Sequence, residues 1–242
     1  MKDMKHIPIT VLNRDPAIGD ADSSEDARES RPLVERIVAD TRLELDRLTP
    51  GRDPLRRGEL LLQLGRALLR LEEMPQAWAA AREAFDIYAA DRSWEGAVHA
   101  CDILFLSDQP QSLPALGQGL WLAVTYPIDP ELTVAILKHV VDETPPESDG
   151  AAVAAITAYY IADMRSQGTQ RDDLLLYAGQ VLTTVARRHS AVDGQEEFDT
   201  WINRLELNDP DRFLPRLRNV IDVLVQDDWW VDRERLAAEL PV

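Results

Sequence analysis

The chain has 242 residues, enough for one large domain or two small ones. Its 26 basic and 43 acidic residues give a formal charge of −17, and because nucleic acids are bound by clustered basic faces, we expect no nucleic-acid partner. Cys101 is the only cysteine, which excludes an intrachain disulfide and a four-cysteine zinc site and favours a reducing compartment such as the cytoplasm.

Residues 1–31 are predicted to form a disordered acidic leader. The segment 13–32 is rich in Asp, Glu, Ser, Ala and Pro and cannot bury enough apolar surface to fold. The short β-prone run HIPITVL, residues 6–12, carries an alternative, in which it adds a strand to the sheet of another protein. The start of the chain lacks the apolar core of a secretory signal, and no run is long enough to span a membrane. We therefore expect no membrane partner.

Residues 32–242 are predicted to form a single α-helical domain, with a soft boundary near residues 145–149, where two prolines adjoin. The alternation of helical stripes and short loops favours antiparallel helical hairpins. We expect about ten helices and no strand, so the predicted fold is all-α with stacked hairpins; a closed α-helical bundle is the alternative. The expected helices cover residues 33–48, 55–71, 76–90, 94–106, 116–124, 130–142, 151–165, 171–189, 196–207, 211–225 and a short one within 227–240.

Small residues occupy the positions where the two helices of residues 58–91 must touch. Gly65, Ala77 and Ala84 follow one another at intervals of 12 and 7 residues. This pattern resembles a tetratricopeptide repeat (TPR), whose period is about 34 residues. A single unit cannot bury its own apolar face, so the rest of the chain is expected to supply neighbouring hairpins. The resemblance implies a TPR-like solenoid with a groove that binds a peptide.

The same resemblance implies which residues contact a partner. First-helix positions line the groove in this family, and here they are Glu59, Leu62, Gln63, Arg66 and Arg70. One TPR subtype grips a C-terminal carboxylate with Lys and Asn, but the corresponding positions carry Leu62 and Arg66, so the Asn is absent.

Two adjacent tryptophans near the end of the sequence are a second candidate contact. Trp229 and Trp230 cannot both face the same side of a helix, and acidic residues flank them. Tryptophan is enriched at binding hot spots, so they are candidate partner anchors; the alternative is that this segment caps the last helical unit.

No motif predicts catalysis, a metal site or a cofactor. The Gly117-Gln118-Gly119 stretch lacks the remaining residues of a phosphate loop. The pairs Glu95–His99 and His139–Glu143 have helical i, i+4 spacing, which surface ion pairing explains.

The predicted function is therefore a non-catalytic scaffold or adaptor that binds a peptide or subunit of another protein. The alternative is an accessory or assembly chaperone of a larger enzyme complex. That complex can be a metalloenzyme. Neither alternative makes the chain an enzyme.

Overall fold

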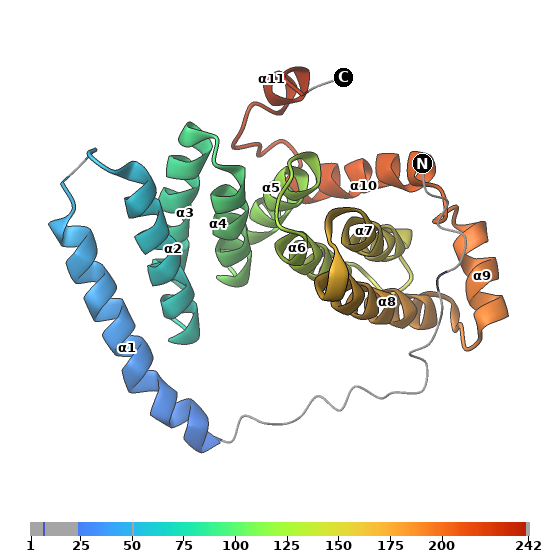
Figure 1. Ribbon diagram of the computed structural model, residues 1–242, viewed down its shortest axis with the longest axis horizontal. Coiled ribbons are helices and arrows are strands. Elements are labelled where there is room, and N and C mark those ends of the chain that lie inside the picture. Colours follow the sequence, from blue (N-terminus) through green and yellow to red (C-terminus); the bar gives the residue numbers. More distant parts are fainter. Residues whose placement is uncertain (1–6, 8–23, 50, 241–242) are drawn as a thin grey trace. The chain divides into compact units, whose positions relative to one another are not determined.

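The computed structural model describes residues 7, 24–49 and 51–240 (Figure 1). Within these residues the chain forms eleven helices and no strand, which confirms the all-α prediction. The helices are α1 (Ser24–Arg47), α2 (Pro54–Arg70), α3 (Met74–Asp91), α4 (Trp94–Leu106), α5 (Ser112–Thr125), α6 (Pro130–Glu143), α7 (Asp149–Arg165), α8 (Gly168–Ser190), α9 (Gln195–Arg204), α10 (Pro210–Val225) and α11 (Arg233–Ala238).

The chain divides into two compact units. Among the described residues, the α1–α5 unit contains 24–49, 51–126 and 224–240, and the α6–α10 unit contains Ile7 and 127–223. The boundary expected near residues 145–149 lies between α6 and α7, which pack against each other inside one unit. Adjoining prolines end a helix, but the next helix still folds back onto it.

The start of the folded part differs from the expected position. Helix α1 begins at Ser24 rather than at residue 32, and Pro32 lies inside it. Of the run HIPITVL only Ile7 belongs to the described residues; it is buried, and its carbonyl accepts a hydrogen bond from Gln195 Nε2 at 3.2 Å. The rest of that run and residues 13–23 of the expected leader lie outside the described residues.

Successive helices of the α1–α5 unit pack side by side, and α2 also packs against α4 (Figure 1). Contact between alternate helices means that the α2–α3 hairpin stacks on the α4–α5 hairpin, as in a helical repeat. The small residues lie at the closest contacts. A Cβ on Gly65 would lie 3.6 Å from the Ala77 carbonyl oxygen and 3.1 Å from Ile103 Cγ2, while Ala77 and Ala84 are fully buried.

The first three helices of the α6–α10 unit pack in a similar order. Helix α7 packs against α6 and α8, and α6 also contacts α8. The Tyr160 and Phe213 rings meet at 5.8 Å between centroids, which places α10 against α7. Alanine-rich α7 is buried along residues 151–158, so it forms the centre of this unit.

A polar network joins the helix ends of the α6–α10 unit. Asp149, the first residue of α7, accepts a hydrogen bond from Arg216 Nη2 at 2.8 Å and lies 3.1 Å from His189 Nε2. Trp201 Nε1 donates to His189 Nδ1 at 3.2 Å, and Arg216 Nη1 donates to the Leu205 carbonyl at 2.6 Å. The network connects α7, α8, α9 and α10.

Candidate functional site

Four of the five predicted groove residues form one exposed polar stripe on α2. Glu59, Gln63, Arg66 and Arg70 are exposed and recur at steps of four, three and four residues, which places them on one side of a helix. Leu62 is only 6% exposed. It packs in the core, so it supports the helix rather than presenting its side chain to a partner.

A matching stripe lies on α4. Glu95, His99, Asp102 and Leu106 each follow an α2 stripe residue by 36 positions. Since α2 packs on α4, the two stripes lie side by side, and Arg66 Nη2 is 2.9 Å from His99 Nδ1. We call these eight residues the α2/α4 face. The α4 stripe was missed from sequence, although its repeated 36-residue offset was a usable signal.

The Tyr88 side chain of α3 packs between α2 and α4, next to the α2/α4 face. Its ring lies in a slot between two glycines: a Cβ on Gly58 would lie 2.9 Å from Tyr88 Cζ, and one on Gly96 would lie 2.4 Å from Cδ1. Burial raises the pKa of the Tyr88 phenol, the Glu59 charge raises it further, and the Arg66 charge opposes both. The phenol therefore stays neutral at physiological pH and adds a hydroxyl beside the two stripes.

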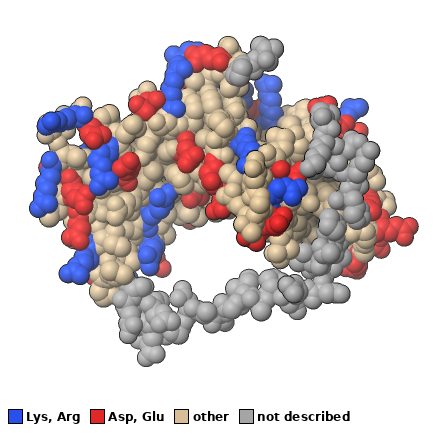
Figure 2. Space-filling view, in the orientation of Figure 1, with Lys and Arg blue, Asp and Glu red and all other residues tan. Residues whose placement is uncertain are grey.

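Charges of both signs are interspersed over the α1–α5 unit (Figure 2). The α2/α4 face itself contains two arginines, one histidine and three acidic residues, and ends in the exposed side chain of Leu106. A mixed surface of this kind suits a polypeptide with both charges and some apolar character better than a polyanion.

Trp230 lies against α3. Its ring centroid is 5.3 Å from that of Phe85 and 6.2 Å from that of Trp78, both edge-on. The Arg82 guanidinium lies 4.2 Å from the centre of the Trp230 ring, within cation–π distance.

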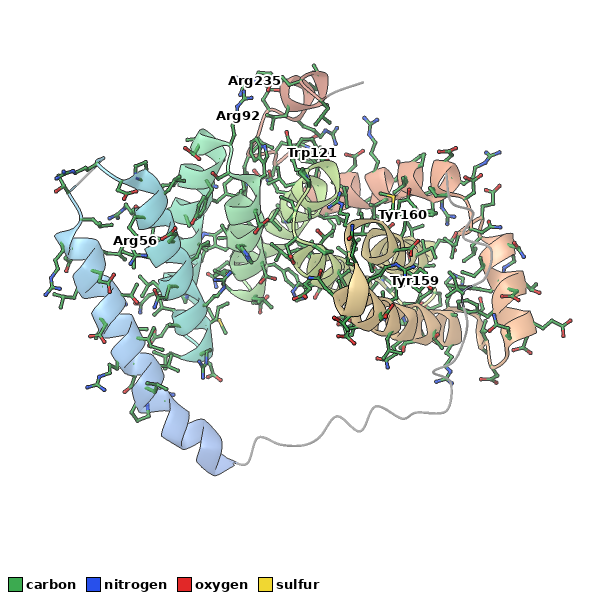
Figure 3. The ribbon with its side chains drawn as sticks, in the orientation of Figure 1. Arg56, Arg92, Trp121, Tyr159, Tyr160 and Arg235 are labelled. Atoms are coloured by element: carbon green, nitrogen blue, oxygen red, sulfur yellow. The ribbon has the colours of Figure 1, made fainter. Side chains whose placement is uncertain are left out.

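Trp229 points to a different cluster. Its ring meets Trp121 of α5 edge-on at 6.0 Å, and Arg233 lies 4.5 Å from its centre. Figure 3 labels Trp121 on α5 and Arg92 just beyond α3, both of which contact residues of the segment that follows α10. We call that segment, residues 226–240, the return segment. Both of its tryptophans are half-buried within the α1–α5 unit.

Three further observations concern chemistry and environment. In the part of the chain that the structure describes, no group of three His, Cys, Asp or Glu residues is arranged to hold a metal ion. Cys101 is fully buried, and burial raises the pKa of its thiol. None of the described helices is both long and apolar enough to cross a membrane.

No family model, curated protein or solved structure matches the chain. The structure itself supports an all-helical fold whose adjacent helices pack together, compatible with a helical repeat.

Proposed function

We propose that the chain is a non-catalytic interaction module that binds an extended segment of another protein on the α2/α4 face. The observation that supports this is the pair of stripes in register: the four exposed polar residues of α2 each have a counterpart 36 positions later on α4, and the two helices pack together. On α4, Glu95 and Leu106 are exposed, while His99 and Asp102 are half-buried. Stacked hairpins of this kind use the side formed by their first helices to bind extended polypeptides.

The charges of the face suggest how a partner binds. Arg66 already contacts His99, so an acidic partner side chain would compete with, or bridge to, that contact. Arg70, one turn further along α2, presents a second guanidinium. Arginine side chains hold carboxylates in two-point contacts, so we expect the partner to place acidic residues opposite these two positions.

Charge reversal tests the proposal. The variant Arg66→Glu/Arg70→Glu should lose the proteins that the wild-type chain captures from its native cells, because each arginine contact becomes a repulsion. The matched control is Arg36→Glu/Arg47→Glu, which makes the same charge change at two exposed positions of α1. Equal capture by both variants would refute the assignment of this face.

Two narrower functions fit this proposal, an adaptor and an assembly factor, and they differ in how the chain binds its partners. A TPR-like adaptor in the cytoplasm should bind several partners below stoichiometry. An assembly factor or chaperone for one enzyme complex should instead retain a single partner at a stoichiometric ratio. Quantitative mass spectrometry of the captured proteins distinguishes the two.

A further inference from the structure

The return segment is held like a bound peptide. Gln118 of α5 is fully buried, and its side-chain amide contacts the return-segment backbone twice. Its Nε2 donates to the Asp228 carbonyl at 2.8 Å, and its Oε1 accepts from the Trp230 amide at 2.9 Å. An amide that pairs with the carbonyl of one residue and the N–H two residues later recognises the main chain itself, as a neighbouring strand does.

Side-chain contacts add sequence selectivity to this backbone recognition. Trp230 enters the cluster formed by Trp78, Phe85 and Arg82, and Trp229 lies against Trp121. Further contacts hold both ends of the segment. Gln111 Nε2 donates to Asp228 Oδ2 at 3.1 Å, and Arg92 binds Glu239 through two hydrogen bonds of 2.5 and 3.2 Å.

The connection to α10 is short and exposed. Helix α10 ends at Val225, the next two residues, Gln226 and Asp227, form an exposed turn, and Asp228 after them is also exposed. Gln226 has a φ of +53°, in the left-handed region that directs the chain back onto α5. If Gln226 adopted a right-handed helical φ, α10 would extend by a residue and direct the segment elsewhere.

We propose that the return segment is exchangeable. The surface that it covers, formed by Trp78, Arg82 and Phe85 of α3 and by Gln118 and Trp121 of α5 and called the groove below, accepts the return segment of a second copy of the chain. The occupant follows from the contacts above: the one sequence shown to fit Gln118 and the tryptophan clusters is the chain's own. Exchange preserves every one of those contacts and changes only the hinge, which is why swapping identical segments is a low-cost route to dimers. The proposal does not depend on the function proposed for the α2/α4 face.

Complementary full-length variants test the exchange. Trp230→Ala should weaken the binding of the return segment to the groove by about a hundredfold or more, because truncating a packed tryptophan removes most of its contacts. It leaves the groove itself intact. Gln118→Leu removes both backbone hydrogen bonds from the groove but leaves the return segment intact. Each variant alone should be monomeric. An equal mixture, tested at total chain concentrations up to about 0.5 mM, should form a heterodimer. This concentration range is chosen because a short tether gives a chain's own return segment an effective concentration of that order.

The double variant Trp230→Ala/Gln118→Leu is the control. Mixed with Gln118→Leu it should form no heterodimer, since neither chain has an intact groove. Circular dichroism must show that all the variants remain helical. A mixture of the two single variants that stays monomeric by light scattering while both are folded would overturn the proposal.

Substitutions at the hinge give an independent test. Gln226→Val disfavours the left-handed conformation, because β-branched residues rarely adopt a positive φ, whereas Gln226→Gly adopts it freely. We expect the dimer fraction to rise about tenfold in Gln226→Val, since the left-handed conformation is costly for such a residue, and to fall in Gln226→Gly. Equal dimer fractions in the two variants would contradict exchange at this hinge.

Discussion

Replacing Gly96 with alanine tests the slot that holds Tyr88. The added Cβ would lie 2.4, 2.5 and 2.6 Å from three carbons of the Tyr88 ring. Carbon atoms pack at about 3.5–4.0 Å, so either the ring or α4 must move. The ring is only 7% exposed and is also confined by Gly58, so it has little room to yield.

The expected loss of stability is the difference between two terms. Overpacking a buried site costs up to about 3 kcal/mol, while replacing a helical glycine with alanine stabilises by about 1 kcal/mol. We therefore expect Gly96→Ala to lower the free energy of unfolding of the α1–α5 unit by about 2 kcal/mol. Urea denaturation followed by tryptophan fluorescence measures this, because five of the six tryptophans belong to this unit.

A double-mutant cycle isolates the cause. In a Tyr88→Ala background the three ring carbons that would crowd the added Cβ are absent, so Gly96→Ala should become neutral or slightly stabilising, a coupling of about 2 kcal/mol. Gly179→Ala in α8 is the matched control, because its nearest neighbour would be Tyr159 Cε2 at 3.8 Å, an ordinary contact. Its unfolding, followed by circular dichroism, should show a gain of about 0.5–1 kcal/mol. If Gly96→Ala costs the same in both backgrounds, crowding by the Tyr88 ring is not the cause.

Three further predictions follow from single groups. Asp149→Ala leaves Arg216 without its carboxylate and should destabilise the α6–α10 unit by roughly 0.5–1 kcal/mol in thermal denaturation, a modest value because Asp149 is half exposed. The Arg92 hydrogen bond lowers the pKa of the Glu239 carboxyl. The stabilisation from that contact is therefore complete above pH 4.5, the ordinary pKa of the carboxyl, and is lost as the pH falls through the lower pKa of the folded state. Acid titration followed by tryptophan fluorescence should show a transition that Glu239→Gln abolishes. Cys101 should react with a thiol reagent at pH 8 only after unfolding, since it is buried and protonated; rapid reaction of the native protein would contradict its placement.

Local patterns predicted the helices and one hairpin well. The positions of Gly65 and Ala77 follow from the need for close approach between neighbouring helices, and the structure confirms that contact. The first helix was predicted only from residue 33, but α1 begins at Ser24 and extends through Pro32. A proline inside a helix removes one backbone hydrogen bond and crowds the preceding turn, yet the chain is helical on both sides of Pro32.

The candidate site was only partly predictable, because it depends on which helices pack together. The stripe of Glu59, Gln63, Arg66 and Arg70 is visible from periodicity alone. Leu62 falls beside that stripe, and only the packing of α2 shows that it turns inward. The contacts of the return segment join residues more than 100 positions apart, such as Gln118 and Trp230, and no local pattern encodes such a pairing.

The α1–α5 unit is discontinuous in sequence, and this has a consequence for synthesis. Its helices leave the ribosome early, but residues 224–240, which cover Gln118 and the clusters around Trp78 and Trp121, leave only after the whole α6–α10 unit has been translated. A nascent chain therefore exposes the open groove while roughly a hundred further residues are added, at rates of about 5–20 residues per second. During that interval on a polysome, the first complete return segment near an open groove can belong to a neighbouring chain.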